Sequence, residues 1–254
     1  NVVKLDKNNR IRDFFFNRLM FPITNEYGKI VGFGGRVLDN SNPKYINSPE
    51  SDFFKKRNIL YNLFNAKQTI RSKKNMLICE GYMDVISLYD KNIKTAVAPL
   101  GTSLTESHLV LSWKYVSKPT LMFDGDTSGL KASFKSAIMS LPYLTPSKLL
   151  QFVILPNQYD PDTYINEFSM NEFAKYLRNP LSIVDFIFDE SSKSIDLSKS
   201  DNKVIFDNYI DELVNNIKDS KIKYFYKNEF KSLFFKKLKS FSKNKSSISI
   251  RKNK

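Results

Sequence analysis

The sequence predicts an α/β protein built on a parallel sheet, preceded by part of a mixed α+β subdomain and followed by a helical subdomain. All eight glycines of the 254-residue chain lie between Gly28 and Gly129, so turns of special geometry are expected in the first half. From Met76, short apolar runs alternate with helical stretches, which is typical of parallel strands joined by right-handed crossovers. After Asp162 no glycine follows, and helical periodicity dominates.

The first part of the sequence predicts a β-hairpin over residues 19–38. Apolar residues 20–23 and 30–33 flank a turn at Asn25-Glu26-Tyr27-Gly28, which is the pattern of two short strands joined by a glycine-containing loop. Residues 39–50 are rich in Asn, Ser and Pro and predict a loop. We place the boundary of this first subdomain at residue 70.

Four short apolar runs predict the strands of the parallel sheet, in a domain that we place at residues 71–170. The runs are residues 76–79, 96–98, 120–123 and 152–155. Helices are expected over 83–89 and 130–141, between the first and second and between the third and fourth of these strands.

Helical periodicity indicates a C-terminal helical subdomain over residues 171–241. One predicted helix carries a single apolar stripe, formed by Phe206, Tyr209, Ile210, Leu213, Val214 and Ile217. The polar stretch 191–203 is expected to be a linker. The basic tail 242–254 is expected to be disordered, because it contains few residues able to form a core.

The composition favours a polyanionic partner. Forty Lys and Arg against 26 Asp and Glu give a formal net charge of +14, which suits nucleic acid, although an AT-rich genome explains the many lysines equally well. One Cys and one His exclude a disulfide framework and a four-ligand zinc site within this sequence. No apolar run approaches the roughly 18 residues of a membrane span, so no membrane partner and a cytoplasmic location are expected.

Acidic residues follow three of the four predicted strands. The six carboxylates are Glu80, Asp84, Asp124, Asp126, Asp160 and Asp162. Because ligands of open α/β sheets bind at the carboxyl ends of the strands, we expect these side chains to converge there. Crowded carboxylates need a cation, and oxygen ligands suit Mg²⁺ or Mn²⁺. The competing interpretation is that each acid only caps the helix that follows it.

The spacing of these acids resembles the Toprim domain of primases, topoisomerases and some nucleases. The resemblance rests on Glu80-Gly81-Tyr82-Met83-Asp84, Asp124-Gly125-Asp126 and Asp160-Pro161-Asp162. It implies that Glu80 assists nucleotide addition, that Asp124 and Asp126 are the principal metal ligands, and that the other three acids complete the site.

Three upstream segments resemble the polymerase domain of bacterial DNA primases. They are residues 17–23, residues 32–38 and the segment Pro43-Lys44-Tyr45-Ile46-Asn47-Ser48-Pro49-Glu50. The resemblance makes residues 1–70 the C-terminal part of the RNA-polymerase subdomain. It also implies that Lys44, Asn47 and Lys56 handle the incoming nucleotide or nascent primer, with Lys44 and Lys56 taking part in catalysis. Arg18 and Arg36 are implied to face template or nucleotide phosphates.

The resemblance implies a DNA primase that joins ribonucleoside triphosphates into short RNA primers on a single-stranded DNA template. A replicative helicase and single-strand-binding protein would be its partners at the replication fork and nucleoid. Since residue 1 is not Met, we expect a piece of a longer chain, with zinc only in a further N-terminal module. Another Toprim enzyme (a nuclease or topoisomerase) and a non-catalytic nucleic-acid or helicase-binding module are the alternatives.

Two residues that often carry chemistry are assigned no catalytic role. His108, the only histidine, is expected at the surface or at the start of a helix. Cys79 lies inside a predicted buried strand and is expected to be inert.

Overall fold

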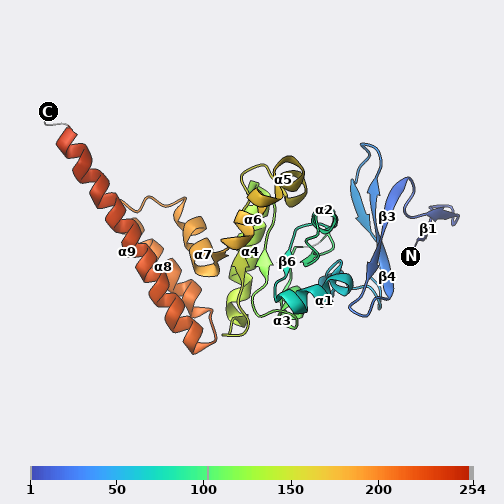
Figure 1. Ribbon diagram of the computed structural model, residues 1–254, viewed down its shortest axis with the longest axis horizontal. Helices are drawn as coiled ribbons and strands as arrows, with labels where there is room; N and C mark the ends of the chain where they lie inside the picture. Colours follow the sequence, from blue (N-terminus) through green and yellow to red (C-terminus); the bar gives the residue numbers. More distant parts are fainter. Residues whose placement is uncertain (1, 102, 252–254) are drawn as a thin grey trace.

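A computed structural model describes residues 2–101 and 103–251, with side chains described as far as residue 240. Figure 1 shows an elongated molecule with β-structure at the N-terminal end, an α/β sheet in the centre and long helices at the C-terminal end. In the part of the chain that the structure describes, no helix is both long and apolar enough to cross a membrane.

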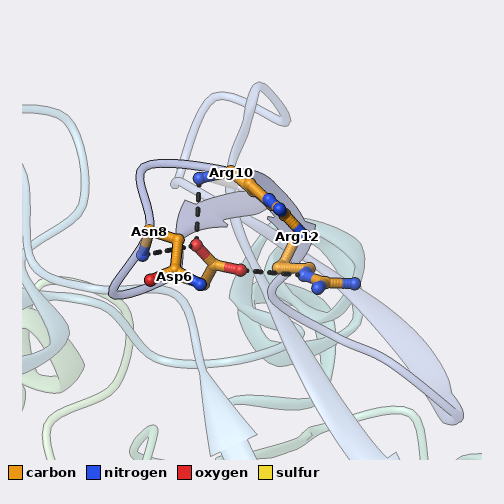
Figure 2. A network of polar contacts seen from close by, with 4 residues as sticks. All are labelled: Asp6, Asn8, Arg10 and Arg12. Carbon is orange, nitrogen blue, oxygen red and sulfur yellow. Dashed lines mark hydrogen bonds and ion pairs between the residues drawn. The ribbon is translucent and has the colours of Figure 1, made fainter.

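A small exposed hairpin, not expected from the sequence, begins the chain. Strands β1 (Val3–Leu5) and β2 (Ile11–Asp13) pair antiparallel. Figure 2 shows the Asp6 carboxylate between them, where it accepts hydrogen bonds from the backbone N–H groups of Asn8 and Arg10 and from Arg12 Nε. These backbone donors hold the pKa of Asp6 below its ordinary value, and they order the turn where no core is available.

The predicted hairpin over 19–38 is confirmed as part of a three-stranded antiparallel sheet. Strand β3 (Arg18–Thr24) pairs with β4 (Ile30–Val37), and the Asn25 side chain accepts two backbone N–H groups within the turn. The predicted loop 39–50 contains a third strand, β5 (Tyr45–Asn47), on the free edge of β4. Three residues are too few to reveal strand alternation in the sequence.

The four predicted strands of the parallel sheet are confirmed, each shorter than its apolar run. The strand order is β10-β9-β8-β6-β7. Strands β6 (Leu77–Ile78), β7 (Ala96–Val97), β8 (Thr120–Leu121) and β9 (Gln151–Phe152) are parallel. The fifth strand, β10 (Leu181–Ser182), was not predicted, because its sequence context Asn179-Pro180-Leu181-Ser182 contains no apolar run. It pairs antiparallel with β9 at the edge.

Helices cover this sheet and bring its acidic loops to one edge. The helices α2 (Tyr82–Asp90) and α4 (Thr127–Ser140) confirm the two predicted crossovers. Helices α1 (Leu63–Lys73), α3 (Glu106–Trp113), α5 (Pro161–Glu167) and α6 (Met170–Arg178) complete this part of the fold. The largest buried cluster joins α1, the sheet and the C-terminal helices through residues such as Ile70, Ile78 and Phe206.

Three further helices form the C-terminal end: α7 (Ile183–Ser192), α8 (Ser200–Asn215) and α9 (Ser220–Arg251). The predicted apolar stripe is confirmed, with Tyr209 partly buried at its edge. The polar stretch 191–203 is only partly a linker, because Leu197 is buried and α8 begins within it. Helix α9 runs on to Arg251, residues 252–254 lie outside the described part, and the expected disorder of the tail 242–254 stays a prediction. The predicted domain boundaries stay predictions.

Candidate active site

The acidic residues meet at the carboxyl edge of the parallel sheet, as their positions predicted. Glu80 and Asp84 stand between β6 and the first turn of α2, Asp124 and Asp126 between β8 and α4, and Asp160 at the start of α5 after β9. Because β6, β8 and β9 are parallel neighbours, their loops share one edge.

Several of these acids cap the helix that follows them. Helix capping and a role in a cation site are therefore compatible in the same residues. Gly129 donates its backbone N–H to Asp126 Oδ1 at 2.7 Å, and Thr163 donates its own to Asp160 Oδ1 at 2.6 Å. Gly81 donates to Asp84 Oδ2 at 3.0 Å. These bonds fix the direction of each carboxylate.

Two carboxylates are strongly perturbed. The pKa of Asp84 is raised to about 7, mainly by burial; the Gly81 N–H lowers it, and the nearby carboxylates of Asp124, Asp160 and Asp162 raise it. Burial also raises the pKa of Asp124 to about 7, aided by Glu80, Asp160 and Asp126. Glu80 is more exposed than these two residues. Partial burial raises its pKa, a hydrogen bond from the backbone of Asp124 lowers it, and the charge of Asp126 raises it. The cluster therefore holds excess negative charge that a cation would relieve.

Asp162 is held by two residues that sequence reasoning missed. The Ser87 hydroxyl on α2 donates a hydrogen bond to Asp162 Oδ1, and Asn166 Nδ2 donates to the same oxygen at 2.9 Å. Ser87 lies three residues after Asp84 on α2, a spacing that places both on one face of the helix. This spacing was the one feature of the sequence that could have indicated that Ser87 lies near the acidic site.

The carboxylates suit a cation that is held partly by its substrate. Within the described residues, no group of three His, Cys, Asp or Glu stands close enough to hold a metal ion, so the expected six-carboxylate ligand set is not preassembled. Asp124 Oδ1, however, is buried and has no hydrogen-bond partner among those residues. Mg²⁺ commonly takes only one or two carboxylates, together with water and phosphate oxygens. Asp124 with one neighbouring carboxylate fits that requirement.

The glycines beside these acids allow close backbone packing. A Cβ on Gly125 would lie 2.3 Å from the carbonyl oxygen of Pro156, and one on Gly129 would lie 2.2 Å from that of Asp124. The loops after β8 and β9 therefore touch through Gly125. Neither glycine has a positive φ. Glycine is required at both positions because a Cβ would collide with a backbone carbonyl oxygen.

Basic residues gather around Tyr45 on β5, beside the acidic edge. The Arg36 guanidinium lies 5.8 Å and Lys44 Nζ 5.7 Å from the centre of the Tyr45 ring, and both residues line a hollow of about 620 Å³. Burial raises the pKa of Tyr45; Arg36 lowers it, whereas Asp84, Asp162 and Asp160 raise it. Tyr45, which sequence reasoning missed, thus stands between the basic hollow and the acidic edge.

Arg18 holds the backbone of the Lys44 loop. Its guanidinium donates to the carbonyl oxygens of Pro43 at 2.8 Å, Lys44 at 3.3 Å and Gly35 at 3.4 Å. With several N–H groups used in this way, Arg18 acts on the loop geometry. The predicted contact between Arg18 and phosphate stays a prediction.

Asn47 and Tyr82 lie where the antiparallel sheet meets the acidic turn. Asn47 Oδ1 and the Tyr82 hydroxyl are buried without hydrogen-bond partners among the described residues. Both approach Gly34, where an added Cβ would lie 3.1 Å from Asn47 Oδ1 and 3.4 Å from the Tyr82 ring. A buried amide oxygen without a donor is costly, and it calls for a partner such as a water or a ligand.

Lys56 is positioned through the only histidine of the chain. Lys56 begins the short 3₁₀ helix η1 (Lys56–Asn58), and its carbonyl oxygen lies 2.9 Å from His108 Nε2. His108 is fully buried at the start of α3, so its expected position at a helix start is correct and its expected exposure is wrong. Burial lowers the pKa of His108. Cys79 is buried, as expected, and burial raises the pKa of its thiol.

Comparison with known proteins places both halves of this arrangement in one class. Residues 1–67 match the family model described as "DNA primase catalytic core, N-terminal domain", and residues 74–146 match the Toprim domain. The DNA primase of Buchnera aphidicola subsp. Acyrthosiphon pisum is 40% identical over 223 residues, which are 88% of this chain and 39% of that protein.

Solved structures give the same result. A structure described as the DnaG primase catalytic domain bound to ssDNA has a TM-score of 0.84 and 33% identity, covering 91% of this chain and 74% of that one. The Aquifex aeolicus primase, described by its zinc-binding and RNA polymerase domains, has a TM-score of 0.77 and 30% identity, covering 91% of this chain and 55% of that one. This chain belongs to the bacterial DNA primase family and contains its Toprim α/β fold. It spans about two fifths of the Buchnera relative's length.

Proposed function

We propose that this chain is the catalytic portion of a DNA primase, a nucleotidyltransferase that synthesises short RNA primers on single-stranded DNA for replication. The observation that carries the proposal is the buried, unpartnered Asp124 Oδ1 among Glu80, Asp126 and Asp160. A site with excess negative charge next to a basic hollow suits a metal-bound triphosphate.

The proposed metal is Mg²⁺, or Mn²⁺ in its place, held first by Asp124 and Asp126. When bound, the ion would neutralise charge on the triphosphate during transfer. Asp84, Asp160 and Asp162 would set the local charge and geometry, and Glu80 would assist attack by the primer hydroxyl. These side chains supply oxygen ligands at one sheet edge, which is the chemistry that Mg²⁺ requires.

The basic hollow is the proposed place for the incoming nucleotide and the nascent primer. Arg36 and Lys44 line it together with Asp39. Asn47 lies outside the hollow, at the junction with the acidic turn, where its Oδ1 is buried without a partner among the described residues, and the role of Lys56 rests on family membership. The lysine ammonium is a mobile point charge and the arginine guanidinium a planar fork, so the two suit different oxygens of a triphosphate. We propose that Arg18 positions this loop, on the strength of its three bonds to carbonyl oxygens.

The single-stranded template and the further partners are proposals drawn from family membership. The relative bound to ssDNA supports a single-stranded DNA template, and the Aquifex primase supports zinc in a separate N-terminal module of the longer protein. A replicative helicase and single-strand-binding protein would bring the enzyme to the replication fork, in the cytoplasm.

One assay distinguishes the candidate functions. The full-length protein is incubated with single-stranded template, labelled ribonucleotides and Mg²⁺, and the products are resolved by size. Short template-dependent RNA is expected. Nicked or relaxed DNA would favour another Toprim enzyme, and the absence of any reaction would favour a non-catalytic module.

A further inference from the structure

Helix α9 carries an exposed face on which lysines alternate with aromatic rings. Tyr224, Phe225 and Phe235 are 64%, 57% and 59% exposed. Tyr224 and Phe235 are eleven residues apart, which is about three helical turns and about 16 Å, so they share one side of the helix. The exposed residues on that side are Lys221, Tyr224, Asn228, Lys231, Phe235 and Lys239, hereafter the α9 face.

The lysines of the opposite side of α9 are used within the fold. Lys227 Nζ pairs with Asp211 of α8 at 3.0 Å, and Lys237 Nζ donates to Ser192 of α7 at 2.6 Å. Lys221 and Lys231 form no ion pair within the described residues. Between residues 220 and 240 the only acid is Glu229. Lys221 and Lys231 therefore present positive charge on the α9 face that no ion pair within the described residues neutralises.

We infer that the α9 face binds single-stranded nucleic acid through phosphate contacts of Lys221 and Lys231 and base stacking on Tyr224 and Phe235. Aromatic rings spaced between cations along a surface are the arrangement that binds unpaired bases without sequence preference. A second copy of this chain is a poor occupant, because like charges would meet across the interface. An acidic peptide would satisfy the lysines but leave the exposed rings without a planar partner.

The position of the α9 face separates it from the candidate active site. In Figure 1, α9 lies at the end of the molecule opposite β3 and β4, with the parallel sheet between them. A strand bound at both places would have to extend from the C-terminal helices to the edge of the central sheet. The α9 face would then hold a distant part of the same strand and raise its effective concentration near the active site.

Binding of fluorescent oligothymidylate to the full-length protein tests this inference independently of primer synthesis. The variant Tyr224→Ala/Phe235→Ala should bind a long oligothymidylate at least about 30-fold more weakly, the lower end for the loss of two stacking contacts of about 1 kcal/mol each. The variant Lys221→Ala/Lys231→Ala should lower the slope of log affinity against log salt by about 1.4, as expected for two phosphate contacts on a single strand. A very short oligothymidylate, able to occupy only one place, should show a smaller loss.

The matched control is Val204→Ala/Ile205→Ala, which removes two side chains of α8 that are 61% and 60% exposed and should leave affinity unchanged. Equal thermal unfolding of all variants would show that the fold is intact. Wild-type affinity and salt slope in both α9 variants would overturn the inference, and so would an equal loss in the α8 control. Either result would mean that nucleic acid is not bound through the α9 face.

Discussion

The Tyr45 ring of β5 meets the Tyr82 ring of α2 edge to face, with centroids 5.4 Å apart and planes at 88°. Tyr45 carries Lys44 and Arg36 beside its ring, and Tyr82 belongs to the acidic turn between Glu80 and Asp84. This pair joins the proposed nucleotide-binding side of the site to its proposed metal-binding side.

The first prediction concerns this contact. Tyr45→Ala should raise the KM for ribonucleotides and lower kcat, because an aromatic pair of this geometry contributes about 0.5–1.5 kcal/mol and the two sides would lose their alignment. Tyr45→Phe keeps the ring and should retain nearly normal kinetics. Steady-state primer synthesis measures both. Normal kinetics in Tyr45→Ala would show that the ring contact does not align the site.

Arg18 gives a second prediction, which separates positioning from phosphate binding. Arg18→Ala should raise the KM for ribonucleotides, and Lys44→Ala should do the same, because without Arg18 the loop carrying Lys44 loses two hydrogen bonds and its tie to Gly35 of β4. Arg18→Lys should restore little, since one ammonium cannot reproduce the guanidinium fork. If Arg18→Lys instead recovered full activity, a simple charge contact with phosphate would explain the residue better. Template affinity at several salt concentrations serves as the control.

The third prediction concerns pH. The pKa of Asp124 rises on folding from 3.8 to about 7, so the folded state holds the proton more tightly. Its stabilising effect is therefore present below about pH 4 and is lost as pH rises through 7. In metal-free protein, Asp124→Asn should match wild-type stability only below about pH 4, exceed it increasingly between pH 4 and 7, and keep that advantage at pH 8. Thermal unfolding with a chelator measures the difference, and Mg²⁺ should raise the Tm of the wild type more than that of the variant. A variant less stable than wild type at pH 8 would contradict this.

The glycines supply a fourth prediction with an internal control. Gly125→Ala should destabilise the fold by about 1–3 kcal/mol or more, because its Cβ would collide with backbone oxygens that cannot move aside freely. Gly81→Ala places a Cβ at an ordinary 3.6 Å from Asp84 Oδ2, with no closer atom, and should cost much less. Chemical denaturation compares the two. Equal losses would show that the close approach at Gly125 is relieved at little cost.

The sequence predicted the hairpin, the parallel strands and the shared acidic edge, because those features are carried by local apolar patterns and by residues next to strand ends. It did not predict β5 or β10, whose pairing depends on a strand distant in the chain. Nor did it predict the bond from Ser87 to Asp162, which joins residues 75 positions apart. Resemblance suggested a phosphate contact for Arg18, but only the folded loop reveals which carbonyl oxygens surround it.

The central claim is that the acidic edge performs metal-dependent nucleotide addition. Asp126→Asn tests it cleanly, because Asn caps a helix as well as Asp does, so the bond from Gly129 survives while the charge is removed. Asp219→Asn is the matched control: Asp219 accepts the Ile222 N–H at the start of α9, far from the sheet edge.

The decisive measurement is the rate of template-dependent RNA primer synthesis by the full-length protein carrying each change. Asp126→Asn should reduce the rate by at least about 100-fold, the scale on which loss of one electrostatic group acts on a charged transition state. Its thermal stability should be equal to or higher than that of the wild type, and Asp219→Asn should retain the wild-type rate. Wild-type synthesis by a folded Asp126→Asn protein would contradict the proposed role of the acidic edge.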